Sequence, residues 1–219
     1  MTDKFHQELR RVKDEVIDMA YMAEAMLRDS VTALKTGDHD LAGSVRDRKS
    51  CLTETNDRLE EEMYQLIALY HPVARDMRLI ACSLKTISSS ERIGRYGKDI
   101  AGVMLETSND RKLPDIVSAL SIPHMADLVL SMIDDSLKAY DEEDISYVTR
   151  HSERDDTIDL LRHTIFREGL SYMMEDPRTI SRCTNYLMVA RYLERCADHS
   201  CKIAEKVIYM VTGERIEIR

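Results

Sequence analysis

The chain has 219 residues, of which 43% are hydrophobic and 32% charged, and it contains 7 Gly, 4 Pro, 2 Phe and no Trp. Sheet proteins need turn residues and aromatic or β-branched strands, so this composition favours long helices packed through Leu, Ile, Met and Ala. The net charge of −9 argues against a nucleic-acid partner, because binding to a phosphate backbone requires a basic surface.

Three long helices are predicted in the first half of the chain, over residues 3–35, 40–70 and 73–105. In the first of them, apolar residues from Phe5 to Met26 recur every three or four positions, which lays one apolar seam along a helix. Gly37 suits the left-handed residue that ends this helix, and Pro72 breaks the chain between the second and third helices. Residues 108–114 are polar and end on Pro, so they are predicted to form a linker.

The same order of helices recurs in the second half, over residues 114–140, 144–174, and from a break at 175–177 to 212, ahead of Gly213. The sixth helix repeats the seam of the third at an offset of 103, which makes Glu91 and Glu194 equivalent. The fifth aligns with the second at an offset of 106, and the three extra residues fit about one added turn near its start. We therefore predict an all-α fold of six long helices: two tandem three-helix bundles related by internal duplication, over residues 1–110 and 111–219.

Glu194 is the only acidic residue in an otherwise apolar or small seam of the sixth helix. An ionised carboxylate in such a seam must be paired, hydrogen-bonded or bound to a metal, because bare burial is costly. Asp198 lies about one turn further on, and Asp155 and Asp159 repeat this spacing on the fifth helix. Two helices would then present carboxylate pairs across a groove, an arrangement that a hard divalent or trivalent cation stabilises.

A metal-free interpretation of the same residues is equally compatible with their spacing. In it, Asp155 and Asp159 lie on a solvated face, and Glu194 pairs with Arg162 or Arg191. Three histidines are left open as either additional ligands or ordinary neighbours of the acids, namely His151, His163 and His199.

Signatures of enzymes are scarce. The sequence has no Gly-rich phosphate loop, no Gly-x-Ser-x-Gly elbow and no HExxH motif. Glu-x-x-His pairs, which di-metal bundle enzymes use, are not placed to converge. We therefore expect a regulator; a metal-dependent helical-bundle enzyme and a metal-free helical scaffold are the alternatives.

Cysteine usage and hydropathy indicate a cytoplasmic protein. The five cysteines are odd in number and form no CxxC pair, which is typical of small core residues in a reducing compartment. No apolar run approaches the roughly 20 residues that span a bilayer. The first residues also lack the apolar core of a signal peptide.

Five segments of the chain together resemble the PhoU family of phosphate-uptake regulators: residues 72–76, 91–101, 175–177, 192–199 and 207–214. The resemblance covers essentially the whole chain in order, and it implies the same two tandem bundles. It also implies a cytoplasmic adaptor that limits phosphate uptake and represses phosphate-starvation signalling. The partners it implies are the phosphate ABC transporter, through its ATPase subunit, and a sensor histidine kinase; we also expect a homodimer.

The resemblance further implies metal ligands at the family's Glu/Asp-x-x-x-Asp motifs, which fall on Asp155, Asp159, Glu194 and Asp198. We expect iron or zinc there, in the second repeat only.

In the first repeat the equivalent positions hold Lys49, Thr53 and Arg95 beside Glu91. Lys49 and Arg95 are predicted to neutralise Glu91 and to repel a metal ion. If the first repeat did retain metal, Glu91 and Asp99 would be the ligands to consider.

Overall fold

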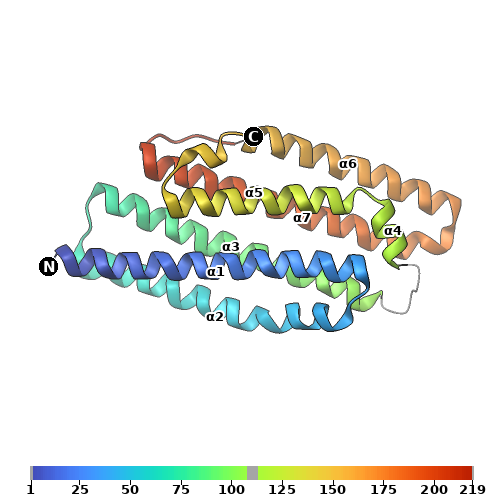
Figure 1. Cartoon of the computed structure of the whole chain (residues 1–219), viewed down its shortest axis with the longest axis horizontal. Coiled ribbons are helices and arrows are strands. Elements are labelled where there is room, and N and C mark those ends of the chain that lie inside the picture. The colour runs from blue at the N-terminus through green and yellow to red at the C-terminus, as the bar shows by residue number, and fades with distance from the viewer. Residues whose placement is uncertain (1, 108–112, 219) are drawn as a thin grey trace.

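The computed structural model describes residues 2–107 and 113–218, which are almost entirely helical and contain no strand. Its long helices are α1 (Thr2–Thr36), α2 (His39–Tyr70), α3 (Ala74–Glu106), α5 (Ile122–Glu142), α6 (His151–Glu175) and α7 (Ile180–Thr212). A short helix, α4 (Leu113–Ala119), and two 3₁₀ turns, η1 (Ile145–Val148) and η2 (Pro177–Thr179), complete the described elements. The long helices run roughly along one axis (Figure 1), and the prediction of an all-α fold with six long helices is confirmed.

The boundaries between the first three helices are set by the residues found at them. Gly37 has φ +71° and ends α1, and the Asp38 carboxylate then caps α2 by accepting from the Leu41 amide at 2.9 Å. His71 adopts φ +46° directly before Pro72, which separates α2 from α3. The predicted linker at 108–114 lies mostly outside the described residues, and α4 begins at its last but one position, residue 113.

Two predicted helices of the second half are interrupted. The helix expected over 114–140 is two helices, because Pro123 stands in the first turn of α5 and lacks the amide hydrogen that a helix interior needs. Glu168 of α6 fixes the break by accepting from the Ser121 amide at 2.9 Å and from its hydroxyl at 2.8 Å. The helix expected over 144–174 begins with η1, and α6 starts only at His151. This 3₁₀ turn lies where the three extra residues of the second repeat were predicted.

The two repeats pack against each other as well as within themselves. α1, α2 and α3 form one bundle, and α5, α6 and α7 form the other. Between the bundles, α3 lies along α7 and α1 contacts α5, so the buried residues form one continuous core. α3 and α7 are antiparallel, since Arg78 near the start of α3 donates to the Met210 carbonyl near the end of α7 at 3.2 Å.

Residues at equivalent positions of the two repeats allow close packing of helices in different ways. In α3, a Cβ added to Gly97 would lie 2.9 Å from the Leu27 amide nitrogen and 3.0 Å from the Met26 carbonyl carbon, so only glycine fits against α1. The equivalent residue of α7 is Ser200, which is fully buried and donates to the Met132 carbonyl at 2.8 Å. The first repeat therefore uses backbone contact where the second uses a hydrogen bond.

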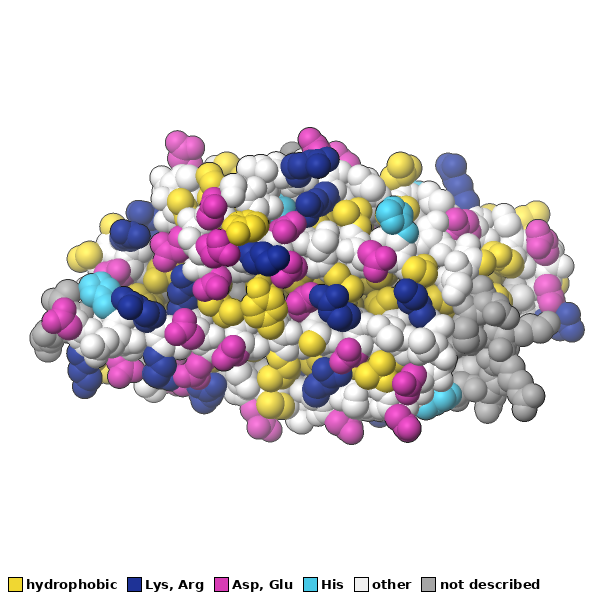
Figure 2. All heavy atoms as spheres, viewed as in Figure 1, with side chains coloured by type: hydrophobic (Ala, Val, Ile, Leu, Met, Phe, Trp, Pro, Cys, Tyr) yellow, Lys and Arg dark blue, Asp and Glu magenta, His cyan; other side chains and the backbone are white. Residues whose placement is uncertain are grey.

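The surface carries charges of both signs. On the face shown in Figure 2, acidic and basic side chains are interspersed around scattered apolar groups, with no broad field of one sign. No helix in the described ranges combines the length and the apolar character needed to cross a membrane.

Candidate functional site

The four predicted metal ligands lie on α6 and α7, which pack side by side in the second repeat. Asp155 is half-buried and Asp159 is exposed, whereas Glu194 and Asp198 keep 20% and 30% of their side chains exposed. Burial raises the pKa of Asp155, and the negative charge of Asp198 raises it further. The structure thus brings Asp155 and Asp198 close enough across the α6–α7 groove to repel one another.

Arginines accompany the two carboxylates of α7. Arg162 Nε lies 3.2 Å from Glu194 Oε2, within ion-pair distance although not aligned as a hydrogen bond. Arg195 Nη1 donates to Asp198 Oδ2 at 2.9 Å. The pairing of Glu194 with Arg162, one of the two arginines weighed from the sequence, is therefore present.

These carboxylates suit a hard cation chemically, but they are not assembled around one point. In the ranges that the structure describes, no group of three or more His, Cys, Asp or Glu side chains is placed to hold a metal ion. The donors fit a metal only in part, since Arg162 and Arg195 would have to leave their acids first. Metal binding at this groove stays a prediction.

One neighbour of the groove escaped the sequence analysis. Cys201 Sγ lies 3.7 Å from Asp155 Oδ1, and only 4% of Cys201 is exposed. Burial and the charge of Asp155 raise the pKa of the thiol. Cys201 follows Asp198 by about one turn, so the sequence could have predicted this contact. It was missed because all five cysteines were interpreted as core residues.

The three histidines have three different environments. His151 is fully buried in the core, where its Nε2 lies 2.8 Å from the Ser136 hydroxyl and 3.2 Å from the Met132 carbonyl, and burial lowers its pKa. His163 is exposed beside Arg162. His199 lies against Tyr96, with ring centroids 6.2 Å apart. Burial, followed by the charges of neighbouring lysines and arginines, lowers the pKa of His199 to about 4.

In the first repeat, cations surround Glu91 as predicted. Lys49 Nζ donates to Glu91 Oε1 at 2.8 Å, and Arg95 Nη2 approaches the same oxygen at 3.4 Å. Burial opposes ionisation, but the hydrogen bond and charge of Lys49 leave the pKa of Glu91 below its usual range. Asp99, one turn beyond Arg95, pairs instead with its neighbour Lys98 at 3.0 Å.

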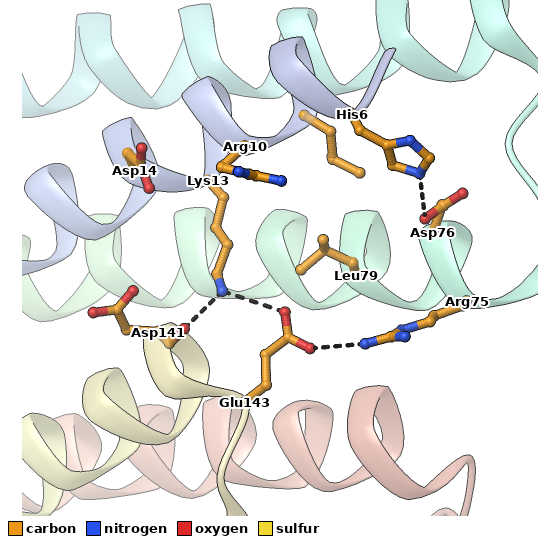
Figure 3. A pocket seen from close by; sticks show the side chains of 10 residues that line it. His6, Arg10, Lys13, Asp14, Arg75, Asp76, Leu79, Asp141 and Glu143 are labelled. Atoms are coloured by element: carbon orange, nitrogen blue, oxygen red, sulfur yellow. Dashed lines mark hydrogen bonds and ion pairs between the residues drawn. The ribbon is translucent and has the colours of Figure 1, made fainter. Parts of the chain in front are cut away.

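A pocket of about 520 Å³ lies away from these acids, between α1, α3 and the end of α5 (Figure 3). Lys13 points into it and donates to the Asp141 carbonyl at 2.7 Å, with Glu143 at 3.5 Å. Arg75 approaches the other oxygen of Glu143 at 3.5 Å, and His6 lies 3.6 Å from Asp76. These contacts join α1 and α3 of the first repeat to α5 of the second, so the pocket belongs to the junction between the repeats.

Comparison with known proteins identifies the family that shares this architecture. The family model described as the PhoU domain matches residues 16–104 and 122–207, one segment in each repeat. The chain belongs to the PhoU family. The phosphate-specific transport system accessory protein PhoU homolog of Clostridium acetobutylicum is 34% identical over all of this chain and 99% of that protein. The homolog of Rhizobium meliloti is 35% identical over 95% of this chain and 87% of that protein.

Solved PhoU structures share the fold. The crystal structure of PhoU from Pseudomonas aeruginosa matches with a TM-score of 0.90 and 32% identity, over 96% of this chain and 100% of that one. The phosphate transport system regulatory protein PhoU from Streptococcus pneumoniae, at 24% identity and a TM-score of 0.86, supports the fold alone. As a member of the PhoU family, the chain is an accessory, regulatory protein of phosphate transport and not an enzyme.

Proposed function

We propose that this PhoU family member is a cytoplasmic negative regulator of phosphate uptake and of phosphate-starvation signalling. The observation that carries the proposal is the similarity to PhoU accessory proteins over almost the full length of both chains. The regulator acts through protein contacts, with the ATPase subunit of the phosphate ABC transporter and with a sensor histidine kinase as its partners.

Deletion and complementation test the regulatory role. Cells that lack the gene should express an alkaline phosphatase reporter of phosphate starvation even when phosphate is plentiful. The intact chain should restore repression, and affinity capture from phosphate-replete cells should recover the transporter ATPase. Normal repression in the deletion strain would contradict the proposal.

We also propose that the second repeat binds iron or zinc through Asp155, Asp159, Glu194 and Asp198. Support comes from the facing pair Asp155 and Asp198, whose mutual repulsion a cation would relieve. Because Arg162 and Arg195 compete for two of the carboxylates, binding would exchange these arginines for the metal.

Elemental analysis of purified protein tests this site. The double change Glu194→Ala and Asp198→Ala should abolish bound metal, whereas Glu91→Ala, the matched change in the first repeat, should leave it unaltered. Full metal content in the double variant would refute the assignment. Absence of metal from the wild-type protein after growth in iron and zinc would favour the scaffold alternative, which the arginine pairs support. Light scattering on the same samples tests the expected homodimer.

A further inference from the structure

Positive charge gathers where the middle of α3 lies along the last part of α7. Lys85 and Arg92 are seven residues apart and therefore share one face of α3, and Lys202 and Lys206 are one turn apart on α7. The antiparallel register, in which Arg78 meets the Met210 carbonyl and Tyr96 stacks on Tyr192, places Lys85 opposite residues 202–206 of α7. Consistent with this placement, burial and then the charges of Lys202 and Lys206 lower the pKa of Lys85. Arg92 lies one turn before Tyr96, whose ring centroid is 6.2 Å from that of His199, so Arg92 also lies beside α7. We name Lys85, Arg92, Lys202 and Lys206 the cationic seam.

The chain's own acids compensate only part of this charge. Glu205 of α7 counteracts the lowering of the Lys85 pKa, but one of its oxygens accepts from the Ile218 amide at 2.9 Å. In the part of the chain that the structure describes, Lys85 and Lys202 have no ion-pair partner within 4.0 Å. The acid nearest to Arg92 is Glu91, at 3.9 Å, and it already accepts a hydrogen bond from Lys49. Repulsion of this kind disfavours the folded state, and an external anion would relieve it.

The internal duplication supplies a comparison, because α3 and α7 are equivalent and antiparallel. At the offset of 103 Arg92 corresponds to another arginine, Arg195. The three lysines differ from their counterparts, since Lys85 corresponds to Met188, Lys202 to Asp99 and Lys206 to Val103. These three counterparts lie together at the opposite end of the same helix pair, where they line a pocket of about 660 Å³. Since the fold accommodates apolar or acidic residues at the same positions, packing does not require the lysines of the cationic seam.

The dimensions of the cationic seam indicate what it binds. Lys85 and Arg92 are separated by about 10 Å along α3. A single phosphate ion, whose oxygens meet their donors at about 2.7–3 Å, would have to draw these side chains together at one point and would leave the rest of the seam unoccupied. Nucleic acid and anionic bilayers extend well beyond the seam and would meet a surface with a net charge of −9. A short acidic protein segment would bring its negative charges to the cationic seam alone. Acids elsewhere on the surface, beyond a screening length of about 8 Å, would repel it only weakly.

We propose that the cationic seam between α3 and α7 is a docking surface for an acidic segment of a partner protein, carrying Asp and Glu side chains over two or three turns. This surface is a property of the chain's own charges and does not depend on the regulatory role proposed above.

Fluorescence anisotropy with a labelled oligo-glutamate peptide of about ten residues, about 15 Å long as a helix, tests the surface. Binding should weaken as salt is raised, and the double change Lys85→Gln and Lys202→Gln should weaken it about tenfold. The matched control is Lys4→Gln with Lys35→Gln, which removes the same charge from exposed positions of α1 and should leave binding unchanged. The single change Lys202→Glu, at an exposed position, serves if the double variant is unstable.

Three outcomes would overturn the proposal. No binding of the peptide at low salt is the first, and equal weakening by the seam and control variants is the second. The third is displacement of the peptide by inorganic phosphate beyond the effect of chloride at equal ionic strength, which would make this a small-anion site. Because only the purified chain and the peptide are present, failure here leaves the role in phosphate regulation to its own genetic test.

Discussion

At the residue scale, Glu91 and Glu194 show that both repeats place an acid in the seam of the third helix and bring a cation to it from the second. The cation is Lys49 in the first repeat and Arg162 in the second. Each pair is partly buried, so its attraction is offset by the cost of removing two charges from water. The difference lies one turn further on, where Arg95 in the first repeat corresponds to Asp198 in the second.

The change Glu91→Gln should lower the free energy of unfolding by about 1–2 kcal/mol at neutral pH, because Lys49 loses its charged acceptor. The pKa of Glu91 is depressed in the fold, so its contribution is fully present above the unfolded pKa of about 4.3 and is lost as pH falls through the folded value. Urea unfolding at several pH values should therefore show the difference between wild type and variant shrinking on acidification. A difference that grew as pH fell would contradict the ion pair.

Three substitutions should convert the first repeat into a second metal site. Lys49→Asp, Thr53→Asp and Arg95→Asp together recreate the carboxylates of α6 and α7 around Glu91, and they remove two cations that repel a metal. Metal content per chain, measured by elemental analysis, should rise above that of the wild type. A folded triple variant with unchanged metal content would show that carboxylates at these positions are insufficient.

Alignment of the repeats was enough to predict the cations around Glu91, because each of them replaces an acid of the other repeat. Spacing alone could not orient His151, which shares an i, i+4 ladder with Asp155 and yet is buried against Ser136. A one-dimensional spacing does not say which face of α6 the neighbouring helices cover. For the same reason, pairing of Glu194 with an arginine and its binding to a metal remained open.

At the element scale, helix ends were predictable wherever one residue forces them. Gly37 and Gly213 adopt φ +71° and +80° at the ends of α1 and α7, as a glycine after a helix predicts. Pro123 was overlooked because a proline in the first turn is compatible with a helix that starts there, and the sequence shows no other sign of the new start. The three extra residues of the second repeat predicted an added turn where η1 lies, but they did not predict that this turn is a 3₁₀ helix.

Close contact between α1 and α3 makes an element-scale prediction. Gly97→Ala should cost about 1–3 kcal/mol, because the new Cβ would meet the backbone of Met26 and Leu27, which cannot move aside as a side chain can. Gly43→Ala in α2 is the matched control. No atom lies within 4 Å of its added Cβ, so it should stabilise the protein by about 0.5–1 kcal/mol. Thermal or urea unfolding distinguishes the two, and equal effects would refute the tight contact.

At the scale of the whole molecule, the two repeats are predicted from sequence as tandem units divided at residues 110 and 111. The order and number of long helices follow from periodicity and breaks, and they are confirmed. What periodicity does not convey is how the bundles meet. The packing of α3 along α7 and of α1 against α5 depends on the outer faces of helices whose inner faces carry the stronger apolar signal.

Cleavage in the polar segment 108–113 should give two fragments of similar mass on a denaturing gel, because exposed polar linkers are cut first. Those fragments should still elute together in native gel filtration, since one core runs through both repeats. Guanidinium should separate them in a single transition that coincides with loss of helix signal. An intact, protease-resistant chain would contradict the linker, and fragments that separate without denaturant would contradict the shared core.

The antiparallel pairing of α3 with α7 also sets the valency of the protein. Two identical repeats would offer every partner two equivalent sites on one chain and could link partners into chains or networks. Here the cationic seam occurs at one end of the helix pair, and the equivalent end holds a pocket lined by apolar residues and by charges of both signs. Each chain therefore presents each surface once, which fixes a one-to-one stoichiometry with any partner that recognises only one of them.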